Sequence, residues 1–193
     1  MPILTLPYRP GGHEITNIET PRINKKINNL PQKSEIVFYF RDNHNKRYTI
    51  LIEEYEHNVF AVKFYLTKHS SSPNKYNIIV NKKNSDAGNA RRIINTCINA
   101  CIHLHSIYPL HSFAFMGERK EKEENYVSTQ RYRIYKTLIS TYFDDSRFEH
   151  IFIQDYSLFM LLNKANLETN PNLRKEIEDM LYDSILPRLA CTP

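Results

Sequence analysis

The chain has 193 residues, of which 41% are hydrophobic and 12% are aromatic, and its 26 basic and 21 acidic residues give a net charge of +5. This length and apolar content predict one folded domain and exclude a disordered chain, while the intermixed charges permit an anionic partner without requiring one. No apolar run reaches the length of a membrane span, and the first residues lack the basic flank of a signal peptide, so we expect no membrane contact.

The first 34 residues hold five prolines and a Gly-Gly pair, and they show neither helical nor strand periodicity. We therefore expect an irregular N-terminal arm over residues 1–34. From Glu35 onward, runs rich in β-branched and aromatic residues alternate with turn-prone residues. These runs predict three antiparallel strands and a fourth strand after a polar break, over 35–40, 47–54, 58–68 and 76–81.

The second half of the chain adds helices. From Ala90 to Tyr108, apolar residues recur at helical spacing, with Asn95, Asn99, His103 and Ser106 on the opposite side. Further patterns predict a buried fifth strand, a second helix, and two strands that meet near Asp155 and Tyr156, over 112–117, 126–142 and 148–164. A last helix should follow, with Asn170 as N-cap, Pro171 in the first turn and an apolar stripe through Leu173, Ile177, Met180, Leu181 and Ser184.

This order of elements predicts an α/β (α+β) protein. Its central sheet should be mixed but largely antiparallel, with about six to seven strands and flanking helices. We expect the domain to cover residues 35–164, with the C-terminal segment 165–193 forming a helix packed on the same domain.

The junction of the fourth strand and the first helix reads Ser85-Asp86-Ala87-Gly88-Asn89-Ala90. Together with the element order over residues 35–164, this segment resembles the GNAT-type acyltransferases. In that family a Q/R-x-x-G-x-G/A loop gives backbone amides to the pyrophosphate of acetyl-CoA. The resemblance implies acetyl-CoA or another acyl-CoA as cofactor, bound at Gly88, Asn89 and Ala90 with charge from Arg91 and Arg92. Ser85 replaces the family's Gln or Arg, and Asp86 adds a negative charge.

A second similarity lies in the second predicted helix, where the family places a tyrosine that protonates the leaving thiolate. The resemblance aligns Tyr135 with this general acid, although the family's following Gly-Phe pair is missing here. Glu118, after the fifth strand, is a candidate base that acts through water, and Glu53 and Glu54 are rival candidates. Segments such as "SFAFMG" and "RYRIYKTL" also resemble small bacterial proteins of unassigned function.

Three residue patterns have two interpretations each. Arg131 falls on the apolar stripe of the second helix, so it needs either an internal acid such as Glu118 or a bound phosphate or carboxylate. Cys97, Cys101 and His105 have the spacing of a metal stripe, but the thiols lie among apolar positions and are better interpreted as core residues. The odd number of three cysteines suggests a reducing, cytoplasmic compartment.

Aromatic and basic residues are interleaved in the first strands, which allows a nucleic-acid-binding sheet. Strand alternation favours instead a sheet with one buried aromatic face, because Tyr39 and Arg41 point opposite to Phe38 and Phe40.

Two functions follow. The first is a GNAT-like, acyl-CoA-dependent N-acyltransferase for an unknown amine acceptor. The alternative is a non-enzymatic GNAT-like module that binds a protein or nucleic acid, for example in a mobile-element or phage-conflict system. The departures at Ser85 and Asp86 and the proline-rich arm favour the alternative.

Overall fold

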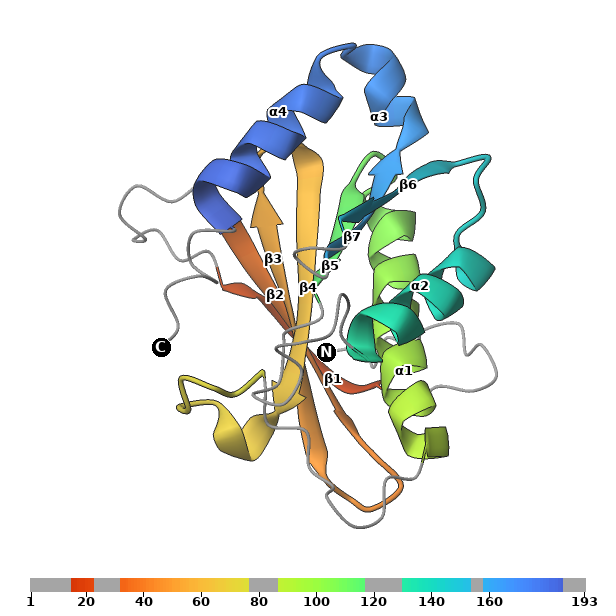
Figure 1. Cartoon of the computed structure of the whole chain (residues 1–193). Helices are drawn as coiled ribbons and strands as arrows, with labels where there is room; N and C mark the ends of the chain where they lie inside the picture. Colours follow the sequence, from red (N-terminus) through yellow and green to blue (C-terminus); the bar gives the residue numbers. More distant parts are fainter. Residues whose placement is uncertain (1–14, 23–31, 77–86, 117–129, 154–157, 186–193) are drawn as a thin grey trace.

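The computed structural model describes residues 15–22, 32–76, 87–116, 130–153 and 158–185 (Figure 1). Its centre is a seven-stranded sheet in the order β1-β2-β3-β4-β5-β7-β6. The strands are β1 (Ile15–Arg22), β2 (Gln32–Arg41), β3 (Arg47–Tyr55), β4 (Val59–Leu66), β5 (Ser112–Met116), β6 (Phe148–Ile153) and β7 (Leu158–Asn163). The ladder between β4 and β5 is parallel, and the other ladders among the described strands are antiparallel. The predicted class and the mixed, largely antiparallel sheet are confirmed.

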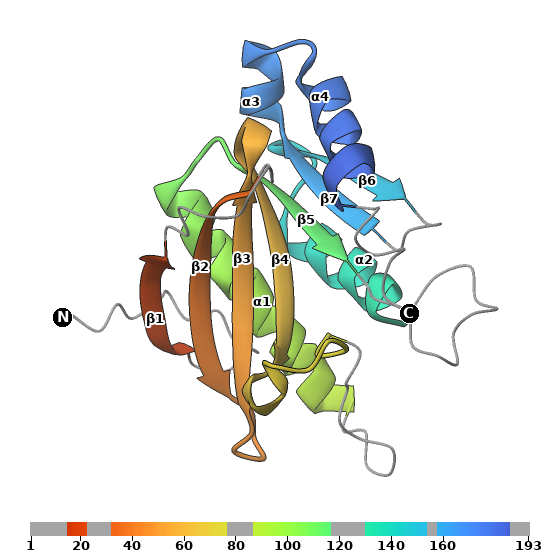
Figure 2. The ribbon, with the colours of Figure 1, turned by 90° about the vertical axis from the view of Figure 1, so that its left-hand side faces the viewer.

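Helices cover both faces of the sheet. The first pair, α1 (Ala87–Ile107) and α2 (Gln130–Tyr142), lies on one face, and the second pair, α3 (Lys164–Thr169) and α4 (Leu173–Met180), lies at the other (Figures 1 and 2). Short turns η1 (Glu56–Asn58) and η2 (Thr67–His69) flank β4, and η4 (Leu181–Ile185) continues α4. None of the helices in the described part of the chain has the length and apolar content that a bilayer crossing requires.

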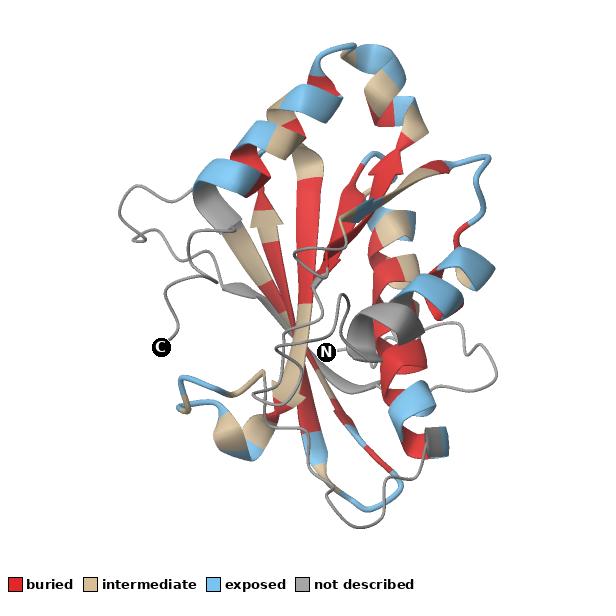
Figure 3. Ribbon diagram, in the orientation of Figure 1, coloured by how far each residue is buried: buried red, intermediate tan, exposed pale blue. Residues whose placement is uncertain are grey.

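The apolar alternation of the strands produces two separate cores. Phe38, Phe40 and Phe113 point toward α1 and α2, where they pack with Ile98 and Ile139. The second core lies on the opposite face of the sheet, where strand residues that point away from α1 pack against α4. It consists of Tyr55, Val59, Ala61, Ala114, Leu158, Met160, Leu162, Leu173, Ile177, Met180 and Leu181. The fully buried strand β7 contributes to both cores, so its first five residues form a continuous apolar run that precedes Asn163 (Figure 3).

Strand β1 corrects the expectation of an irregular arm. Residues 15–22 pair with β2 at the edge of the sheet, and β2 itself begins at Gln32. The pairing is irregular between Ile15 and Asn17 and between Glu19 and Arg22, the second interval containing Pro21. Proline is tolerated at sheet edges and bulges because it donates no ladder hydrogen bond. The absence of alternation in the sequence therefore reflects a bulged edge strand.

The C-terminal region also differs from the prediction. Asn170 ends α3, and the N-cap of α4 is Asn172. The Asn170 side-chain oxygen accepts a hydrogen bond from the Asn172 amide at 3.0 Å, which places Pro171 in the turn between the two helices. The short helix α3 was not expected, and it begins after Asn163, whose side chain accepts hydrogen bonds from the amides of Ala165 and Asn166.

The remaining elements follow the prediction closely. The strands expected over 35–40, 47–54 and 58–68 are β2, β3 and β4, and the strand pair over 148–164 is β6 and β7. Most of the strand expected at 76–81 and the start of the second helix at 126–129 lie outside the described residues, while Tyr76 is in a turn. In α1, Asn95 is buried and not on the solvent side as expected.

The second core predicts that α4 and the sheet unfold together. Ile177 is fully buried against the sheet, so Ile177→Ala should lower the free energy of unfolding by about 2–5 kcal/mol. Urea denaturation followed by circular dichroism measures this change, and the exposed neighbour Lys175 provides the control Lys175→Ala. A loss below 0.5 kcal/mol for Ile177→Ala would show that α4 does not contribute to the stability of the sheet.

Candidate functional site

The candidate site lies where β4 and β5 separate, close to the start of α1. The two strands pair in parallel from Val59 and Ser112 to Val62 and Phe115. Beyond this ladder, β4 continues through Lys63–Leu66 and remains paired with β3 alone among the described strands. Figure 2 shows the strands side by side at their amino ends and diverging toward their carboxyl ends. We call this divergence the β4–β5 fork.

Ligands of open α/β sheets bind outside the carboxyl ends of parallel strands, where neighbouring connections leave in different directions. The chain leaves β4 through η2 and enters α1 at Ala87, so the amino end of α1 lies toward the carboxyl end of β4 (Figure 1). The fork and the first turn of α1 therefore belong to the same end of the sheet.

Gly88 lies within the first turn of α1, not in a loop ahead of it as the sequence suggested. Gly88 and Ala90 are exposed, and so are Arg91 and Arg92 in the next turn. Small residues leave the backbone of this turn accessible, and the positive end of the helix dipole favours an anion here. The two arginines add positive charge beside the same turn.

Asn89 differs from its neighbours because its side chain is buried and binds the hairpin between β2 and β3. Its amide nitrogen donates a hydrogen bond to Asp42 Oδ2 at 3.0 Å. The other carboxylate oxygen of Asp42 accepts hydrogen bonds from the backbone amides of His44 at 2.9 Å and Lys46 at 2.8 Å. Asp42 thus ties the start of α1 to the β2–β3 turn, a contact across 47 residues of sequence.

The environment of Asp42 keeps its carboxylate ionised. Burial raises its pKa, but the hydrogen bonds from Asn89, Lys46 and His44 outweigh burial, so the pKa lies below the ordinary value of 3.8. The neighbouring Tyr48 responds in the opposite direction, since burial and the charge of Asp42 raise its pKa to about 12. Asp42 is therefore an internal anion whose charge is already compensated by hydrogen bonds.

The candidate bases on β3 face opposite sides of the sheet. Glu53 accepts a hydrogen bond from Tyr55 Oη at 2.8 Å and lies 2.6 Å from Lys63 Nζ, at the first residue of β4 beyond the ladder with β5. Glu54 accepts a hydrogen bond from Ser34 Oγ at 2.6 Å and lies 3.4 Å from His111 Nε2. Both carboxylates already have internal partners, and only the Glu53 pair lies at the fork.

Two other predicted residues lie on α2, and the remaining ones lie outside the described residues. Tyr135 and Arg131 are part of α2, which packs beside α1 through Leu138 and Ile139, but the positions of their side chains are not described. Glu118 lies outside the described residues, as do Ser85 and Asp86.

The cysteine stripe of α1 lies in the core. Cys97 and Cys101 form no disulfide and have 1% and 0% exposure, and burial raises the pKa of Cys101 well above its ordinary value. His105 packs against Phe148, with ring centroids 5.2 Å apart. Among the described residues, no group of three or more His, Cys, Asp or Glu side chains has the arrangement of a metal site.

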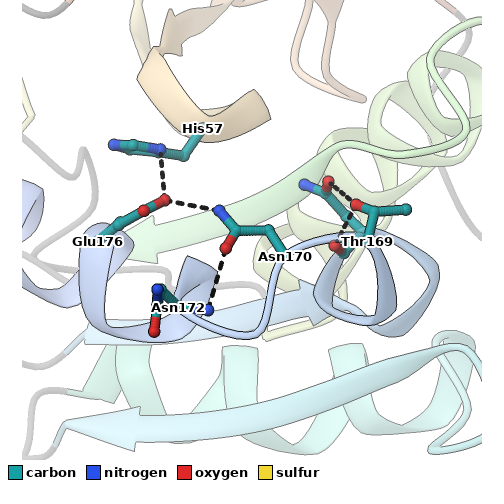
Figure 4. Close-up of polar contacts among 6 residues, drawn as sticks. His57, Thr169, Asn170, Asn172 and Glu176 are labelled. Atoms are coloured by element: carbon teal, nitrogen blue, oxygen red, sulfur yellow. Dashed lines mark hydrogen bonds and ion pairs between the residues drawn. The ribbon is translucent and has the colours of Figure 1, made fainter.

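Sequence reasoning missed a polar cluster at the opposite end of the sheet. Glu176 on α4 lies 3.3 Å from His57 Nδ1 and accepts a hydrogen bond from Asn170 Nδ2 at 2.9 Å (Figure 4). His57 occupies the turn between β3 and β4 with φ of 59°. The cluster fastens this turn to the α3–α4 connection, and its partners are internal, so it has a structural role.

The Asp42 contact predicts a pH-dependent contribution to stability. Asp42→Asn should lower the free energy of unfolding at pH 7 by about 1–3 kcal/mol, because the buried donors lose a charged acceptor. A lowered pKa means that the stabilisation is present above pH 3.8 and is lost as the pH falls below it. In urea titrations, the difference from the wild type should therefore shrink toward pH 3.

The exposed residue Asp179 provides the control Asp179→Asn, which should change little at either pH. If the free energies of unfolding of the wild type and Asp42→Asn differ by the same amount at pH 7 and at pH 3, the stabilising role of the Asp42 carboxylate is contradicted.

Comparison of the chain with models of protein families, with curated proteins and with solved structures finds no match.

Proposed function

We propose that the protein is a GNAT-like N-acyltransferase that uses acetyl-CoA or another acyl-CoA. The β4–β5 fork carries this proposal, because the family described above binds its cofactor at the start of the helix after the fourth strand and its amine between the splayed fourth and fifth strands. With β1 counted, β4 and β5 are the fourth and fifth strands of the described sheet, and their ladder ends at Val62 and Phe115. The strand expected as the fourth, at 76–81, lies mostly outside the described residues.

The first turn of α1 has small side chains and nearby positive charge, and both properties suit the binding of a pyrophosphate. Gly88 and Ala90 place no large side chain over the turn, and Arg91 and Arg92 are exposed beside it. The one nearby carboxylate described, Asp42, is engaged by Asn89 and by two backbone amides. Its charge is therefore offset locally and does not exclude an anion from the turn.

Bound acyl-CoA would supply an activated thioester carbonyl. The amides of Gly88, Asn89 and Ala90, with Arg91 and Arg92, would hold its pyrophosphate. Arg131 would add a further positive charge. In the catalytic roles that the resemblance implies, the Tyr135 hydroxyl donates a proton and Glu118, through water, removes one from the acceptor amine.

The second candidate function is the non-enzymatic binding module. It is favoured by the engagement of Glu53 and Glu54, since each of these rival bases already binds internal partners. In this case the fork would be a remnant of the fold and would bind no acyl-CoA. A ligand-binding experiment separates the two functions.

Thermal denaturation with CoA and acetyl-CoA tests the proposed cofactor. At about 100 times its dissociation constant, a ligand that binds only the native state stabilises it by about 2.7 kcal/mol. We expect both ligands to raise the melting temperature of the wild type and to have no effect on Gly88→Trp, whose indole would cover the first turn of α1. Ser106→Trp, at an exposed position in the last turn of the same helix, should keep the full shift. An unchanged melting temperature of the wild type would favour the binding module.

A second experiment tests the proton donor. Tyr135→Phe should lower the release of free CoA thiol from acetyl-CoA in the presence of an amine, such as a polyamine or a lysine peptide, by about 10²- to 10⁴-fold. The thermal shift by CoA should remain, because the phenyl ring keeps the bulk of the side chain. Unchanged turnover with Tyr135→Phe would remove this residue from the mechanism without affecting the cofactor site.

A further inference from the structure

The two faces of strands β2, β3 and β4 differ in what covers them. Phe38 and Phe40 point toward α1, as the sequence predicted. On the opposite face, the register places Tyr39, Thr49 and Tyr65 in one row across the three strands. Helix α4 packs on this face only farther along, at Tyr55, Val59 and Ala61. Figure 2 shows α1 behind these strands, α4 to the upper right and the β2–β3 turn at the bottom.

A cluster of aromatic and basic residues occupies this part of the sheet. We call it the tyrosine face, and it consists of Tyr39, Arg41, Arg47, Tyr65, Lys75 and Tyr76. The rings of Tyr65 and Tyr76 lie edge to face with centroids 5.5 Å apart. Lys75 Nζ lies 4.7 Å from the Tyr65 centroid and 5.2 Å from the Tyr76 centroid.

The second part of the tyrosine face lies on β2 and β3. Arg47 Cζ is 4.3 Å from the Tyr39 ring centroid. Arg41 pairs directly across from Arg47 at the end of the β2–β3 ladder, and its guanidinium donates hydrogen bonds to the backbone and side-chain oxygens of Asn45. The three tyrosine rings are half-buried, whereas Arg41 and Arg47 are exposed.

The positive charges of this face have no ion-pair partner among the described carboxylates. Among the described residues, neither Arg41, Arg47 nor Lys75 forms an ion pair with Asp or Glu. Arginines directly opposite each other in a ladder repel, so the Arg41–Arg47 pair lowers stability unless an anion lies between them. The chain thus places three cations beside partly exposed aromatic rings.

Acidic residues mark the limit of the tyrosine face. Toward α4, the next row on the same side of the sheet is Val37, Leu51 and Lys63, and the row after it holds Glu35 and Glu53. Lys63 Nζ lies 5.7 Å from the Tyr76 ring centroid and forms an ion pair with Glu53. A negatively charged ligand is therefore confined to the part of the sheet near the β2–β3 turn. It would run across the strands from Arg41 and Arg47 toward Lys75.

We propose that the tyrosine face binds single-stranded nucleic acid. Bases stack on the Tyr39 and Tyr65 rings, and phosphates contact Arg41, Arg47 and Lys75. An acidic peptide would satisfy the cations but would not use the aromatic rings, and a duplex would keep its bases from them. The proposal does not depend on acyl-CoA binding, because the tyrosine face lies on the side of the sheet opposite to α1.

Fluorescence anisotropy with labelled dT and rU 12-mers tests this proposal on the full-length chain. The wild type should bind at about 50 mM salt, and the logarithm of its affinity should fall linearly with the logarithm of the salt concentration. Binding of the DNA strand, the RNA strand or both supports the proposal and identifies the natural class of strand. Lack of binding to both strands, or equally tight binding to a DNA duplex or to polyglutamate, would overturn it.

Two variants separate stacking from charge. Tyr65→Ala should lower the affinity about fivefold or more and leave the salt dependence unchanged, because stacking involves no counterion. Arg47→Gln combined with Lys75→Gln should lower the affinity roughly tenfold and reduce the salt slope by about 0.7 for each lost phosphate contact.

Lys136 provides the matched control for Lys75. Lys136 belongs to α2, on the opposite side of the sheet, and its Nζ lies 4.6 Å from the Phe152 ring centroid. Lys136→Gln therefore removes the same charge from a similar cation–aromatic contact. Its affinity and salt slope should equal those of the wild type. The single variant Lys75→Gln should weaken binding. If Lys136→Gln weakens binding as much as Lys75→Gln does, attraction by net charge explains the binding and the tyrosine face is excluded. Circular dichroism and melting temperatures of all variants show whether each one is folded.

Discussion

The short parallel ladder between β4 and β5 is the constraint on which the rest of this structure depends. It joins two antiparallel units, β1–β2–β3–β4 and β5–β7–β6, through residues 59–62 and 112–115. A parallel connection needs a long crossover, and α1 provides it while packing on the joined strands. On the other side, α4 contacts both units through Val59 and Met160. Two helical layers thus reinforce a ladder that would be weak by itself.

The same constraint explains why the two candidate sites lie at one end of the molecule. The ladder between β4 and β5 ends at Val62, so the carboxyl half of β4 diverges from β5. Among the described strands, this half of β4 pairs only with β3. The fork and the start of α1 follow from this divergence. The tyrosine face follows from the limited reach of α4, which covers Ala61 but leaves Tyr65 partly exposed. One protein therefore presents an anion-compatible helix turn and a basic aromatic surface on opposite sides of the sheet.

The strands and α1 were predictable because local periodicity directly reflects which face is buried. Phe38 and Phe40 alternate with Tyr39 and Arg41, and this alternation is enough to assign the two faces of β2. Strand β1 was not predictable, since Pro21 and its irregular register remove the pattern. Helix α3 is six residues long, too short to show a period, although Asn163 is a suitable N-cap.

The candidate site was predictable only in part. The resemblance implied a cofactor site at Gly88, Asn89, Ala90 and the two arginines that follow them. The side chain of Asn89 instead binds Asp42. A hydrogen bond between residues 47 positions apart has no signature in a single sequence. The tyrosine face was predictable in part, because the interleaved aromatic and basic residues of the first strands already allowed a nucleic-acid-binding sheet. The approach of Lys75 to Tyr65 from the turn after β4 had no such signature.

The position of α4 in the chain has a consequence for biosynthesis. The residues that cover Tyr55, Val59 and Ala61 belong to positions 173–181, far along the chain from the strands that they cover. During translation, the first four strands emerge long before this cover does, so an apolar strip stays open to water until residues 173–181 have been made. A chain that stops before Leu173 would keep that strip permanently, which makes premature termination a route to aggregation.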